Sequence, residues 1–403
     1  MHEKHLLVQL ATVPVTLWSF FHGQASYMRK RGLDVTAVSS PDEVLDRFGN
    51  REGIEVHGVE MQRAISPHRD IVALFELRRL FRRLRPTIVH SHTPKGGLLG
   101  TLAARLSGVP VCIYHIHGLR YMGAQGLSRW VLKSMEWVAC RFAHKVLCVS
   151  PSIVEQAVQD RVCPRRKIST LLGGSYNGVD AANRFNPDMV PADTREGVRR
   201  DLGIPMDAPV VGFVGRVVRD KGIVELSTAW TRLREEFPTA HLLIVGPLEP
   251  HEPLPPDVEA ALREGSRLHM LGEREDTPSL YSAMNNLVLP TYREGLGMTL
   301  LEAAAMELPV VATRIPGCVD AVEDGVTGTL VPVRDAKALA EAIRRYLLDP
   351  ELRKQHGKAG RERVLREFRQ EAIWEALYQE YCRLLRERGL PLPQPVEQPA
   401  CAE

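Results

Sequence analysis

Short apolar runs recur along the chain and alternate with longer segments in which apolar positions have the spacing of an amphipathic helix. In the first half, the expected strands are residues 5–11, 33–39, 87–91, 111–116, 145–149 and 168–172. In the second half, they are residues 209–215, 241–246, 286–290 and 309–313. This alternation predicts an α/β fold whose parallel sheets are covered by helices on both faces.

The length of 403 residues exceeds one ordinary domain, so we expect two. A polar, proline-containing stretch at 187–207 separates the two groups of strands. The predicted domains are residues 1–190 and 191–365, followed by a charged helix at 366–390. Residues 391–403 are rich in proline, and we expect a disordered tail there.

Composition is that of an ordinary folded protein, with 44% apolar and 25% charged residues. The seven cysteines are odd in number and form no Cys-x-x-Cys pair, which argues against a disulfide framework or a zinc site and suits a reducing cytoplasm. The first residues do not resemble a signal peptide, and no apolar run approaches the ~18 residues of a spanning helix. We therefore expect a cytoplasmic protein.

Charge is distributed unevenly between the two halves. Residues 1–190 carry 25 Lys and Arg against 15 Asp and Glu, whereas the remainder carries 27 against 34, which agrees with the net charge of +3. Much of the excess lies on a predicted amphipathic helix that ends near residue 85 and carries Arg78, Arg79, Arg82, Arg83 and Arg85. Such a helix can lie on an anionic membrane surface, or it can be a core helix with a solvated basic face. No nucleic-acid-binding motif accompanies the positive charge, so nucleic acid is not an expected partner.

Two glutamates flank a glycine-containing turn in the second half. Glu294 follows the expected strand 286–290, and Glu302 lies in the opening turns of the next helix. Ligands of open α/β sheets bind at the carboxyl ends of the strands. The backbone N–H groups of the turn lie near a helix N-terminus, where they can hold anionic or hydroxyl-rich ligands; they belong to Gly295, Leu296, Gly297 and Met298. The alternative is a solvated glutamate and a second one that is favoured only by the helix dipole.

Two cations follow the first strand of the second half. Arg216 and Lys221 lie on the loop that follows the run 209–215, and a helix is expected from Gly222. Arginine offers a planar fork and lysine a movable point charge, so together they can neutralise a leaving diphosphate. A surface charge pair on a loop is the alternative.

The first half contains two further candidate segments. Residues 86–100 predict a strand, a turn and a helix N-terminus with Lys95. Residues 110–118 predict the next strand, which ends in His115, Ile116, His117 and Gly118. His115 and His117 point to the same side of a regular strand, and either one could instead be a structural histidine.

Taken together, these motifs resemble those of retaining glycosyltransferases of family 4. The resemblance covers most of the chain and implies the GT-B architecture, in which two Rossmann-like domains face each other across a cleft and a C-terminal helix crosses back to the first domain. It implies that Glu302 holds the donor ribose and that Glu294 lies against the donor sugar and phosphates. It also implies that Arg216 and Lys221 clamp the diphosphate and that His117, before its glycine, faces the donor sugar.

A subgroup is indicated by Thr-Pro-Lys-Gly-Gly at 93–97 and by Asn-Gly-Val-Asp at 177–180. Both resemble bacterial transferases that build capsular, O-antigen or lipid-linked oligosaccharides. That resemblance implies a UDP-hexose or UDP-N-acetylhexosamine donor and a lipid-linked saccharide acceptor. Lys95 is then a candidate for the acceptor phosphate or else a solvent-exposed lysine, and Thr16 is a further acceptor candidate.

One segment departs from the family pattern. Many relatives carry paired glycines after the first strand, placed against the donor phosphates, whereas residues 11–24 have none and contain Pro14 instead. The family's phosphate contact is therefore not carried over to this loop. Its aromatic residues either pack in the core or face a lipid-like acceptor; they are Trp18, Phe20 and Phe21.

The sequence therefore predicts a transferase that needs no metal, because no Asp-x-Asp accompanies the donor motifs and the two cations can replace an ion. Three rivals stay open at this point. They are a UDP-sugar epimerase of the same fold, a dinucleotide-dependent oxidoreductase, and a non-catalytic partner subunit. The oxidoreductase is disfavoured because neither half of the chain opens with Gly-x-Gly-x-x-Gly. The presence of all four charged residues argues against the non-catalytic subunit; they are Arg216, Lys221, Glu294 and Glu302.

Overall fold

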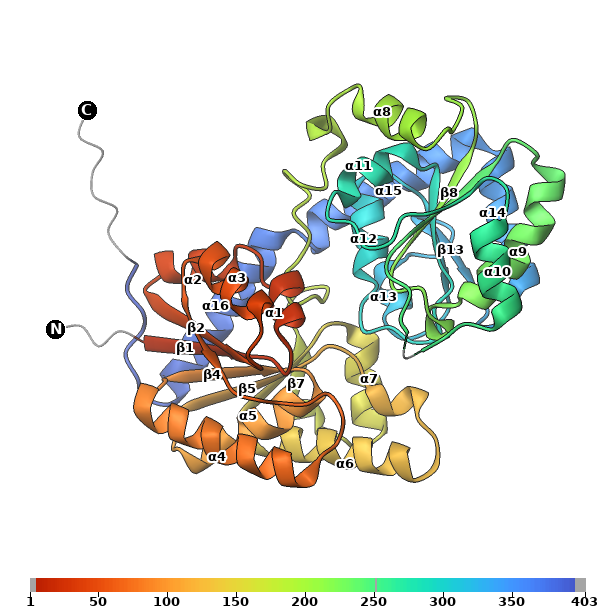
Figure 1. Cartoon of the computed structure of the whole chain (residues 1–403). Coiled ribbons are helices and arrows are strands. Elements are labelled where there is room, and N and C mark those ends of the chain that lie inside the picture. Colours follow the sequence, from red (N-terminus) through yellow and green to blue (C-terminus); the bar gives the residue numbers. More distant parts are fainter. Residues whose placement is uncertain (1–4, 251, 396–403) are drawn as a thin grey trace, which may run out of the picture. The chain divides into compact units, whose positions relative to one another are not determined.

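The structure is a computed structural model that describes residues 5–250 and 252–395 (Figure 1). The chain divides into two compact units. Unit 1 contains Met1–Gly178 and Glu371–Glu403, and unit 2 contains Val179–Gln370. The predicted first domain extended to residue 190, so the observed division comes earlier in the chain.

Unit 1 is built on a seven-stranded parallel sheet with the order β3-β2-β1-β4-β5-β6-β7. Its strands are β1 (His5–Leu10), β2 (Leu33–Ser39), β3 (Glu55–Gly58), β4 (Ile88–His92), β5 (Val111–Ile116), β6 (Lys145–Cys148) and β7 (Ile168–Thr170). Its helices are α1 (Pro14–Phe20), α2 (Gln24–Lys30), α3 (Glu43–Glu52), α4 (Pro67–Leu84), α5 (Pro94–Leu106), η1 (Arg120–Gly123), α6 (Gly126–Phe142), α7 (Pro151–Gln159), η2 (Arg165–Lys167) and α16 (Gln370–Glu387).

Unit 2 is built on a six-stranded parallel sheet with the order β10-β9-β8-β11-β12-β13. Its strands are β8 (Val210–Val214), β9 (His241–Val245), β10 (Leu268–Met270), β11 (Asn286–Leu289), β12 (Val310–Thr313) and β13 (Gly328–Val331). Its helices are η3 (Pro187–Met189), α8 (Thr194–Asp201), η4 (Arg219–Lys221), α9 (Ile223–Glu236), α10 (Pro256–Glu264), α11 (Thr277–Ala283), α12 (Met298–Ala305), α13 (Cys318–Ala321), α14 (Ala336–Leu348) and α15 (Pro350–Glu367). The predicted α/β class with two Rossmann-like parallel sheets is confirmed.

Every strand expected from the sequence is present within one or two residues. The three strands that the sequence did not reveal are β3, β10 and β13, and each lies at an edge of its sheet. β3 and β10 contain no fully buried residue. An edge strand is paired on one side only, so it needs a shorter apolar run than a central strand does.

The last helix of the chain packs in the core of unit 1, as the resemblance implied. Helix α16 buries a residue at every fourth position, against the sheet and against residues of α2 such as Met28. The buried residues are Ile373, Leu377, Tyr381 and Leu385. After this helix, Pro391 O accepts a hydrogen bond from His5 Nε2 at 2.8 Å. Residues 391–395 form no helix or strand, and the rest of the predicted tail lies outside the described residues.

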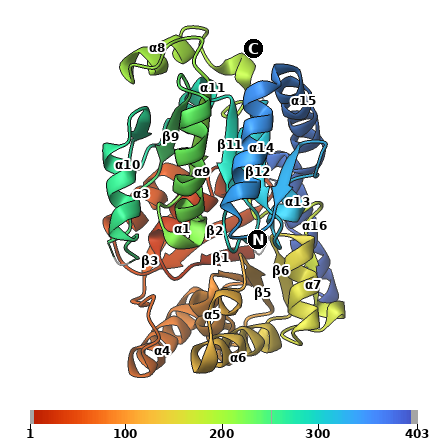
Figure 2. The ribbon, with the colours of Figure 1, turned by 90° about the vertical axis from the view of Figure 1, so that its right-hand side faces the viewer.

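Helices cover both faces of the sheet in unit 1. Helices α2 and α16 pack on one face, whereas α4 and α5 pack on the other. Helices α4, α5 and α6 lie side by side (Figure 2). Within the described part of the chain, no helix has the length and apolarity needed to cross a bilayer.

Both sheets reverse their strand order at one place, where the chain turns from one edge of the sheet to the other. The reversal lies between β1 and β4 in unit 1 and between β8 and β11 in unit 2. Loops that leave neighbouring strands on opposite sides of such a point open a crevice at the carboxyl edge of the sheet, which is where α/β proteins bind ligands.

Helix α5 approaches the sheet closely at Gly97. A Cβ on this residue would lie 2.1 Å from Tyr114 Cε2, on a strand where Tyr114 is buried. The Gly97→Ala variant should therefore lower the free energy of unfolding by about 1–3 kcal/mol, because the core is already full. Urea denaturation measures this change.

The matched control is Gly197→Ala on helix α8, where the added Cβ meets only Arg200 Nη2, at 3.9 Å. Alanine in place of a helical glycine should stabilise by up to about 1 kcal/mol. Equal stability of the Gly97 variant and the wild type would contradict the close packing of α5 on β5.

Candidate functional site

The charged residues predicted in the second half converge at the strand-order reversal of unit 2. Arg216 and Lys221 follow β8, and Glu294 follows β11, which is the neighbouring strand. Helix α12 begins directly after the glycine turn and carries Glu302 one turn further on. The sequence therefore placed these residues on the correct elements.

Lys221 and Glu294 form an ion pair at this edge of the sheet. Lys221 Nζ lies 2.5 Å from Glu294 Oε2, and both side chains are largely buried, with 19% and 18% of their surface exposed. The pair joins the loop after β8 to the loop after β11. Because an ammonium group has three donors, Lys221 can keep this contact and still donate to an anion.

The two loops are also joined through Asp220. Its backbone oxygen accepts hydrogen bonds from Tyr292 N at 2.8 Å and from Thr291 Oγ1 at 3.1 Å. Its carboxylate Oδ2 lies 2.9 Å from Arg293 Nε. These contacts fix the backbone on both sides of the Lys221–Glu294 pair.

The glycine after Lys221 is required by the same junction. Gly222 adopts a φ of +74°, and a Cβ there would lie 2.0 Å from Pro290 O. No other residue fits both the left-handed backbone and the space, which explains why glycine follows the lysine.

Arg216 is held more loosely than Lys221. Its guanidinium lies 3.7 Å from Glu249 and 3.8 Å from Glu252, and 43% of the side chain is exposed. Two carboxylates at these distances attract the arginine without forming a close bidentate pair. Neither glutamate was predicted from the sequence, although Glu249 and Glu252 follow β9 and thus lie on the loop next to that of Arg216.

Glu302 is a carboxyl group in an apolar setting. Its Oε2 accepts a hydrogen bond from Tyr281 OH at 3.1 Å, and its neighbours on α12, Leu301 and Ala303, are buried. Burial raises the pKa of Glu302 to about 7, against an ordinary value of 4.5. A carboxylate at this position is a strong acceptor for hydroxyl groups once it is ionised.

In unit 1, His117 follows β5 and is partly exposed. Its Nε2 lies 2.9 Å from His92 Nδ1, and its ring stacks on Phe20 with centroids 5.5 Å apart. Burial lowers the pKa of His117 to about 3, so the ring is neutral. His115 is fully buried and has no surface for a substrate, so of these two histidines only His117 is accessible.

Lys95 is neither exposed nor without a partner. Its Nζ lies 2.7 Å from Asp70 Oδ1, and the side chain is 6% exposed, so the alternative of a solvent-exposed lysine is wrong. An acceptor phosphate would have to compete with Asp70 for this charge. Thr16, the other acceptor candidate, is buried in α1. Neither acceptor role is tested by these contacts, and both stay predictions.

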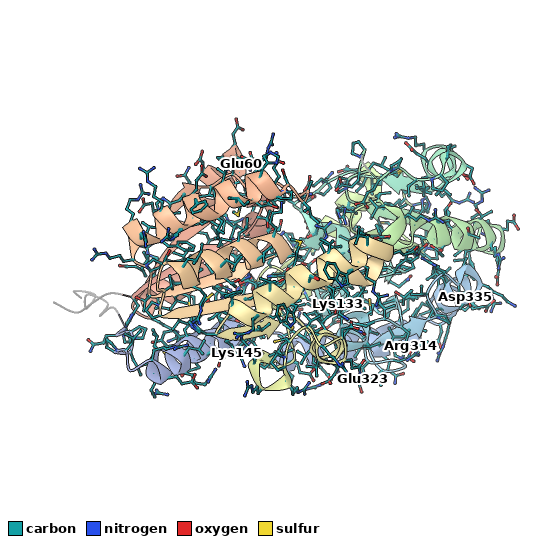
Figure 3. The ribbon with its side chains drawn as sticks, turned by 90° about the horizontal axis from the view of Figure 1, so that it is seen from below. Glu60, Lys133, Lys145, Arg314, Glu323 and Asp335 are labelled. Atoms are coloured by element: carbon teal, nitrogen blue, oxygen red, sulfur yellow. The ribbon has the colours of Figure 1, made fainter. Side chains whose placement is uncertain are left out.

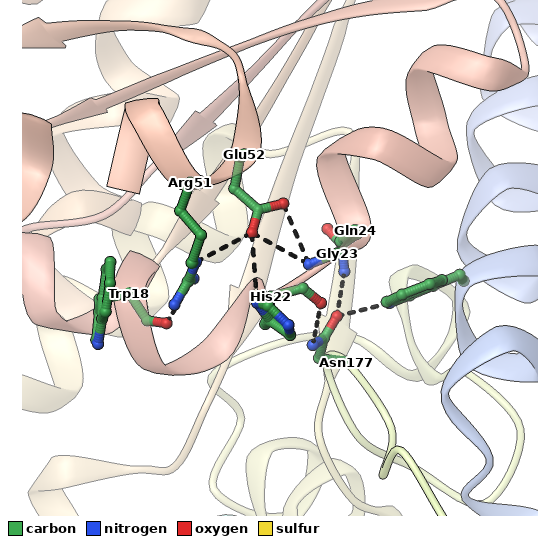
Figure 4. Close-up of polar contacts among 8 residues, drawn as sticks. Trp18, His22, Gly23, Gln24, Arg51, Glu52 and Asn177 are labelled. Carbon is green, nitrogen blue, oxygen red and sulfur yellow. Dashed lines mark hydrogen bonds and ion pairs between the residues drawn. The ribbon is translucent and has the colours of Figure 1, made fainter. Parts of the chain in front are cut away.

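The loop without paired glycines is fixed by a carboxylate and an amide (Figure 4). Glu52 accepts the backbone N–H of Gly23 with both oxygens at 3.1 Å, and Arg51 Nε lies 3.3 Å from Glu52 Oε1. Asn177 donates to His22 O at 3.3 Å. The Gly23 amide therefore already donates to the Glu52 carboxylate, which agrees with the absence of a phosphate-binding glycine pair.

The aromatic residues of this segment differ in their surroundings. Phe21 is buried edge-on against His92, with ring centroids 4.6 Å apart, and Phe20 packs on Tyr176. Trp18 is partly exposed beneath the Arg51 guanidinium, 4.0 Å from the ring centroid. The core interpretation therefore holds for Phe21.

Metal-binding capacity lies away from the donor motifs. Among the described residues, the group with metal-ligand spacing is His90, His92 and His115 in unit 1. In that part of the chain, no such group includes Glu294 or Glu302, the carboxylates of the donor motifs. His90 and His92 lie in the 86–100 segment, for which only Lys95 was a candidate site residue.

The raised pKa of Glu302 has a consequence for stability. An acid whose pKa is higher in the folded chain keeps its proton while the unfolded chain loses it, so stability falls as pH rises from 4.5 to about 7 and is constant above that. The Glu302→Gln variant should escape this loss. Its melting temperature relative to the wild type should therefore rise between pH 4.5 and 7. A difference in melting temperature that stays constant across this range would contradict the raised pKa of Glu302.

Comparison with known families and structures agrees with this arrangement. The family model of glycosyl transferases group 1 matches residues 194–363, and that of the glycosyl transferase 4-like domain matches residues 17–174. The structure of Anabaena Alr3699/HepE in complex with UDP and glucose superposes with a TM-score of 0.79 at 19% identity, covering 94% of this chain and 99% of that one. At this identity the likeness shows the fold.

Curated relatives resemble the chain over most of its length. The capsular polysaccharide biosynthesis glycosyltransferase CapM of Staphylococcus aureus is 33% identical over 383 residues, which cover 95% of this chain and 97% of the relative. The UDP-Gal:alpha-D-GlcNAc-diphosphoundecaprenol alpha-1,3-galactosyltransferase of Escherichia coli is 29% identical over 71% of this chain and 73% of its own. The chain therefore belongs to the group 1 glycosyltransferases, with a glycosyl transferase 4-like domain in its first half.

Proposed function

We propose that this glycosyltransferase moves a hexose or N-acetylhexosamine from a UDP-sugar to a lipid-linked saccharide, with retention of anomeric configuration, in cell-envelope polysaccharide synthesis. The observation that carries the proposal is the group of charges at the strand-order reversal of unit 2. There Lys221, Glu294 and Arg216 lie on neighbouring loops, and Glu302 follows on α12. Cations for a diphosphate and carboxylates for hydroxyl groups match the two parts of a nucleotide sugar. The name of the S. aureus relative supports a role in capsular polysaccharide synthesis, and the name of the E. coli relative supports a UDP-sugar donor and a lipid-linked acceptor.

The two cations perform the main electrostatic task in this mechanism. When the bond between the sugar C1 and the diphosphate oxygen breaks, negative charge grows on the departing UDP. Lys221, already oriented by Glu294, and the more loosely held Arg216 stabilise that charge. These cations take the place of a metal ion.

Retention follows if the acceptor hydroxyl attacks the face that the diphosphate leaves. The new bond joins C1 to the acceptor oxygen, and the acceptor proton passes to the departing phosphate oxygen. No enzymic base is then required. Glu302 in its ionised form holds the donor ribose, and neutral His117 orients the donor sugar.

The donor assignment predicts the effect of removing either cation. Arg216→Ala and Lys221→Ala should each weaken UDP binding by about tenfold or more, because a hydrogen bond to a charged group contributes about 1.5–3 kcal/mol. Isothermal titration calorimetry measures the affinity.

The control for these variants is Arg274→Ala, which removes an exposed arginine of unit 2 that is paired with Asp276. UDP affinity should be unchanged in this variant. Unchanged affinity in both the Arg216 and the Lys221 variants would refute the diphosphate site.

The reaction is tested by incubating the protein with UDP-sugars and lipid-linked saccharides in the presence of EDTA. A glycosylated lipid whose new linkage has the anomeric configuration of the donor is the expected product, seen by mass spectrometry and NMR. Conversion of the UDP-sugar without an acceptor would indicate the epimerase instead. Loss of turnover in EDTA with recovery on Mg²⁺ would show that the cations do not replace a metal.

A membrane surface as partner is supported by the outward faces of α4 and α6. On α4, Ile71, Val72 and Phe75 are exposed beside the exposed arginines of the same helix. On α6, Trp130 and Trp137 are 67% and 51% exposed. Exposed aromatic and aliphatic side chains next to cations are the composition of an interfacial surface.

A shallow cavity on α6 adds to this surface. It has a volume of about 270 Å³ and is lined by the two tryptophans together with Lys133 and Arg161. Lys133 projects from α6 in the view of Figure 3. Ring faces and cations together suit an anionic lipid headgroup.

The membrane proposal predicts salt-dependent binding to vesicles. The protein should co-sediment with anionic vesicles at low salt and be released at high salt, since each basic residue at such a surface contributes about 1 kcal/mol and salt screens it. Replacing Arg82 and Arg83 on α4 with Glu should reduce sedimentation without changing UDP affinity.

The matched control replaces Arg165 and Arg166 of η2 with Glu, because this causes the same change in net charge near β7, at the edge of the same sheet. Binding should survive that change. Failure of the wild type to bind anionic vesicles at low ionic strength would overturn the membrane proposal and leave the UDP site untouched.

A further inference from the structure

Three histidines gather in the core of unit 1 on two neighbouring strands. His90 and His92 lie on one face of β4, and His115 lies opposite His92 on β5. All three are fully buried, and each offers a ring nitrogen within 4.8 Å of those of the other two. The ring centroid of His90 lies 4.2 Å from that of His92 and 5.4 Å from that of His115.

Several nitrogens of this cluster have no hydrogen-bond partner among the described residues. They are His90 Nε2 and both ring nitrogens of His115. Buried polar atoms without partners are rare, because each has lost its hydration and gained nothing in return. Such atoms in a folded core point to a ligand that they share.

The other nitrogens are oriented by polar side chains of the same unit. Gln9 Oε1 lies 2.8 Å from His92 Nε2, while the Gln9 amide nitrogen donates to Gln24 Oε1 at 3.1 Å. His92 therefore carries its proton on Nε2, which leaves a lone pair on Nδ1. His90 Nδ1 lies 2.7 Å from Tyr381 OH. Histidines that bind metals are held in this way, with the second ring nitrogen fixed by a hydrogen bond.

We propose that His90, His92 and His115 bind one late first-row divalent metal ion, of the zinc class. Neutral imidazoles are ligands that zinc, copper and nickel accept, and three of them form a common zinc set. With metal–nitrogen bonds of about 2.0–2.1 Å, the rings of such a set have centroids roughly 5 Å apart, close to the observed 4.2, 5.4 and 5.6 Å.

Closing the set requires two small rearrangements. The rings of His90 and His115 are parallel within 4°, so one of them must turn to direct its nitrogen to the common point. His115 has no hydrogen bond to lose when it turns. His92 must offer Nδ1, which now lies 2.9 Å from His117 Nε2.

This last contact gives the ion an effect beyond its own site. Metal binding at His92 Nδ1 displaces His117, the one partly exposed histidine of this group. The ion is distinct from any metal at the donor phosphates, and its binding does not depend on the proposed reaction. Metal occupancy would instead shift the position of His117.

The test uses tag-free, chelator-treated protein titrated with ZnCl₂ in a calorimeter, followed by elemental analysis after gel filtration. One equivalent of zinc per chain is expected. Zinc-edge X-ray absorption on the wild type should show imidazole nitrogens at about 2.0–2.1 Å. No stoichiometric binding, or a shell without imidazole, overturns the proposal without the need for any variant.

Variants then locate the ion. His115→Gln should weaken zinc binding at least tenfold, whereas His117→Gln should retain one equivalent, since it frees His92 Nδ1. The control is His269→Gln, which disrupts the other close histidine pair, His241 and His269 of unit 2, whose nitrogens are 2.9 Å apart. Circular dichroism confirms folding of each variant. Equal loss in the control, or no loss in folded His115→Gln, assigns the ion elsewhere and overturns the proposal.

Discussion

The reversal of strand order between β8 and β11 is the constraint on which the candidate donor site depends. Because these strands are neighbours that lead to opposite sides of the sheet, the loops after them meet at one edge. Lys221 and Glu294 are 73 residues apart in sequence, and their 2.5 Å ion pair exists only because of that reversal. Asp220, which bonds to the loop after β11 through both its backbone oxygen and its carboxylate, then fixes the spacing between the two loops.

The charges of this site differ in how firmly they are held, and the difference suits their proposed tasks. Lys221 is largely buried and in close contact with a carboxylate, whereas Arg216 is more exposed and lies 3.7–3.8 Å from two carboxylates. A pre-oriented cation needs little reorganisation when charge develops on a leaving group. A loosely held arginine can follow a flexible diphosphate. Glu302 differs from these charges because burial raises its pKa to about 7. Its ionised form therefore lowers the stability of the folded chain.

Unit 1 contains an unusual amount of polar material in its core. Four histidines, Gln9 and Tyr381 lie at the carboxyl ends of β1, β4 and β5 and on α16, where apolar packing would be more stable. Some of their nitrogens have partners and others have none within the described part of the chain. Polar groups that are retained at such a cost are often functional, and both His117 and the proposed metal ligands belong to this network. Helix α16 takes part in it through Tyr381, which contacts Gln9 and His90, so residues far apart in the sequence form one network.

The sequence alone determined the fold class, the central strands and the elements on which Arg216, Lys221, Glu294 and Glu302 lie. It could do so because buried parallel strands are continuous apolar runs and because glycine, lysine and glutamate follow them at places that backbone geometry restricts. Only the tertiary structure decided which groups touch. The pairing of Lys95 with Asp70, the two glutamates beside Arg216 and the edge strands β3, β10 and β13 left no local signal. The same holds for the histidine cluster, whose members are visible in the sequence but separated by a whole helix. Side chains from different strands meet according to sheet order and register, and these are set by the packing of the entire unit rather than by neighbours along the chain.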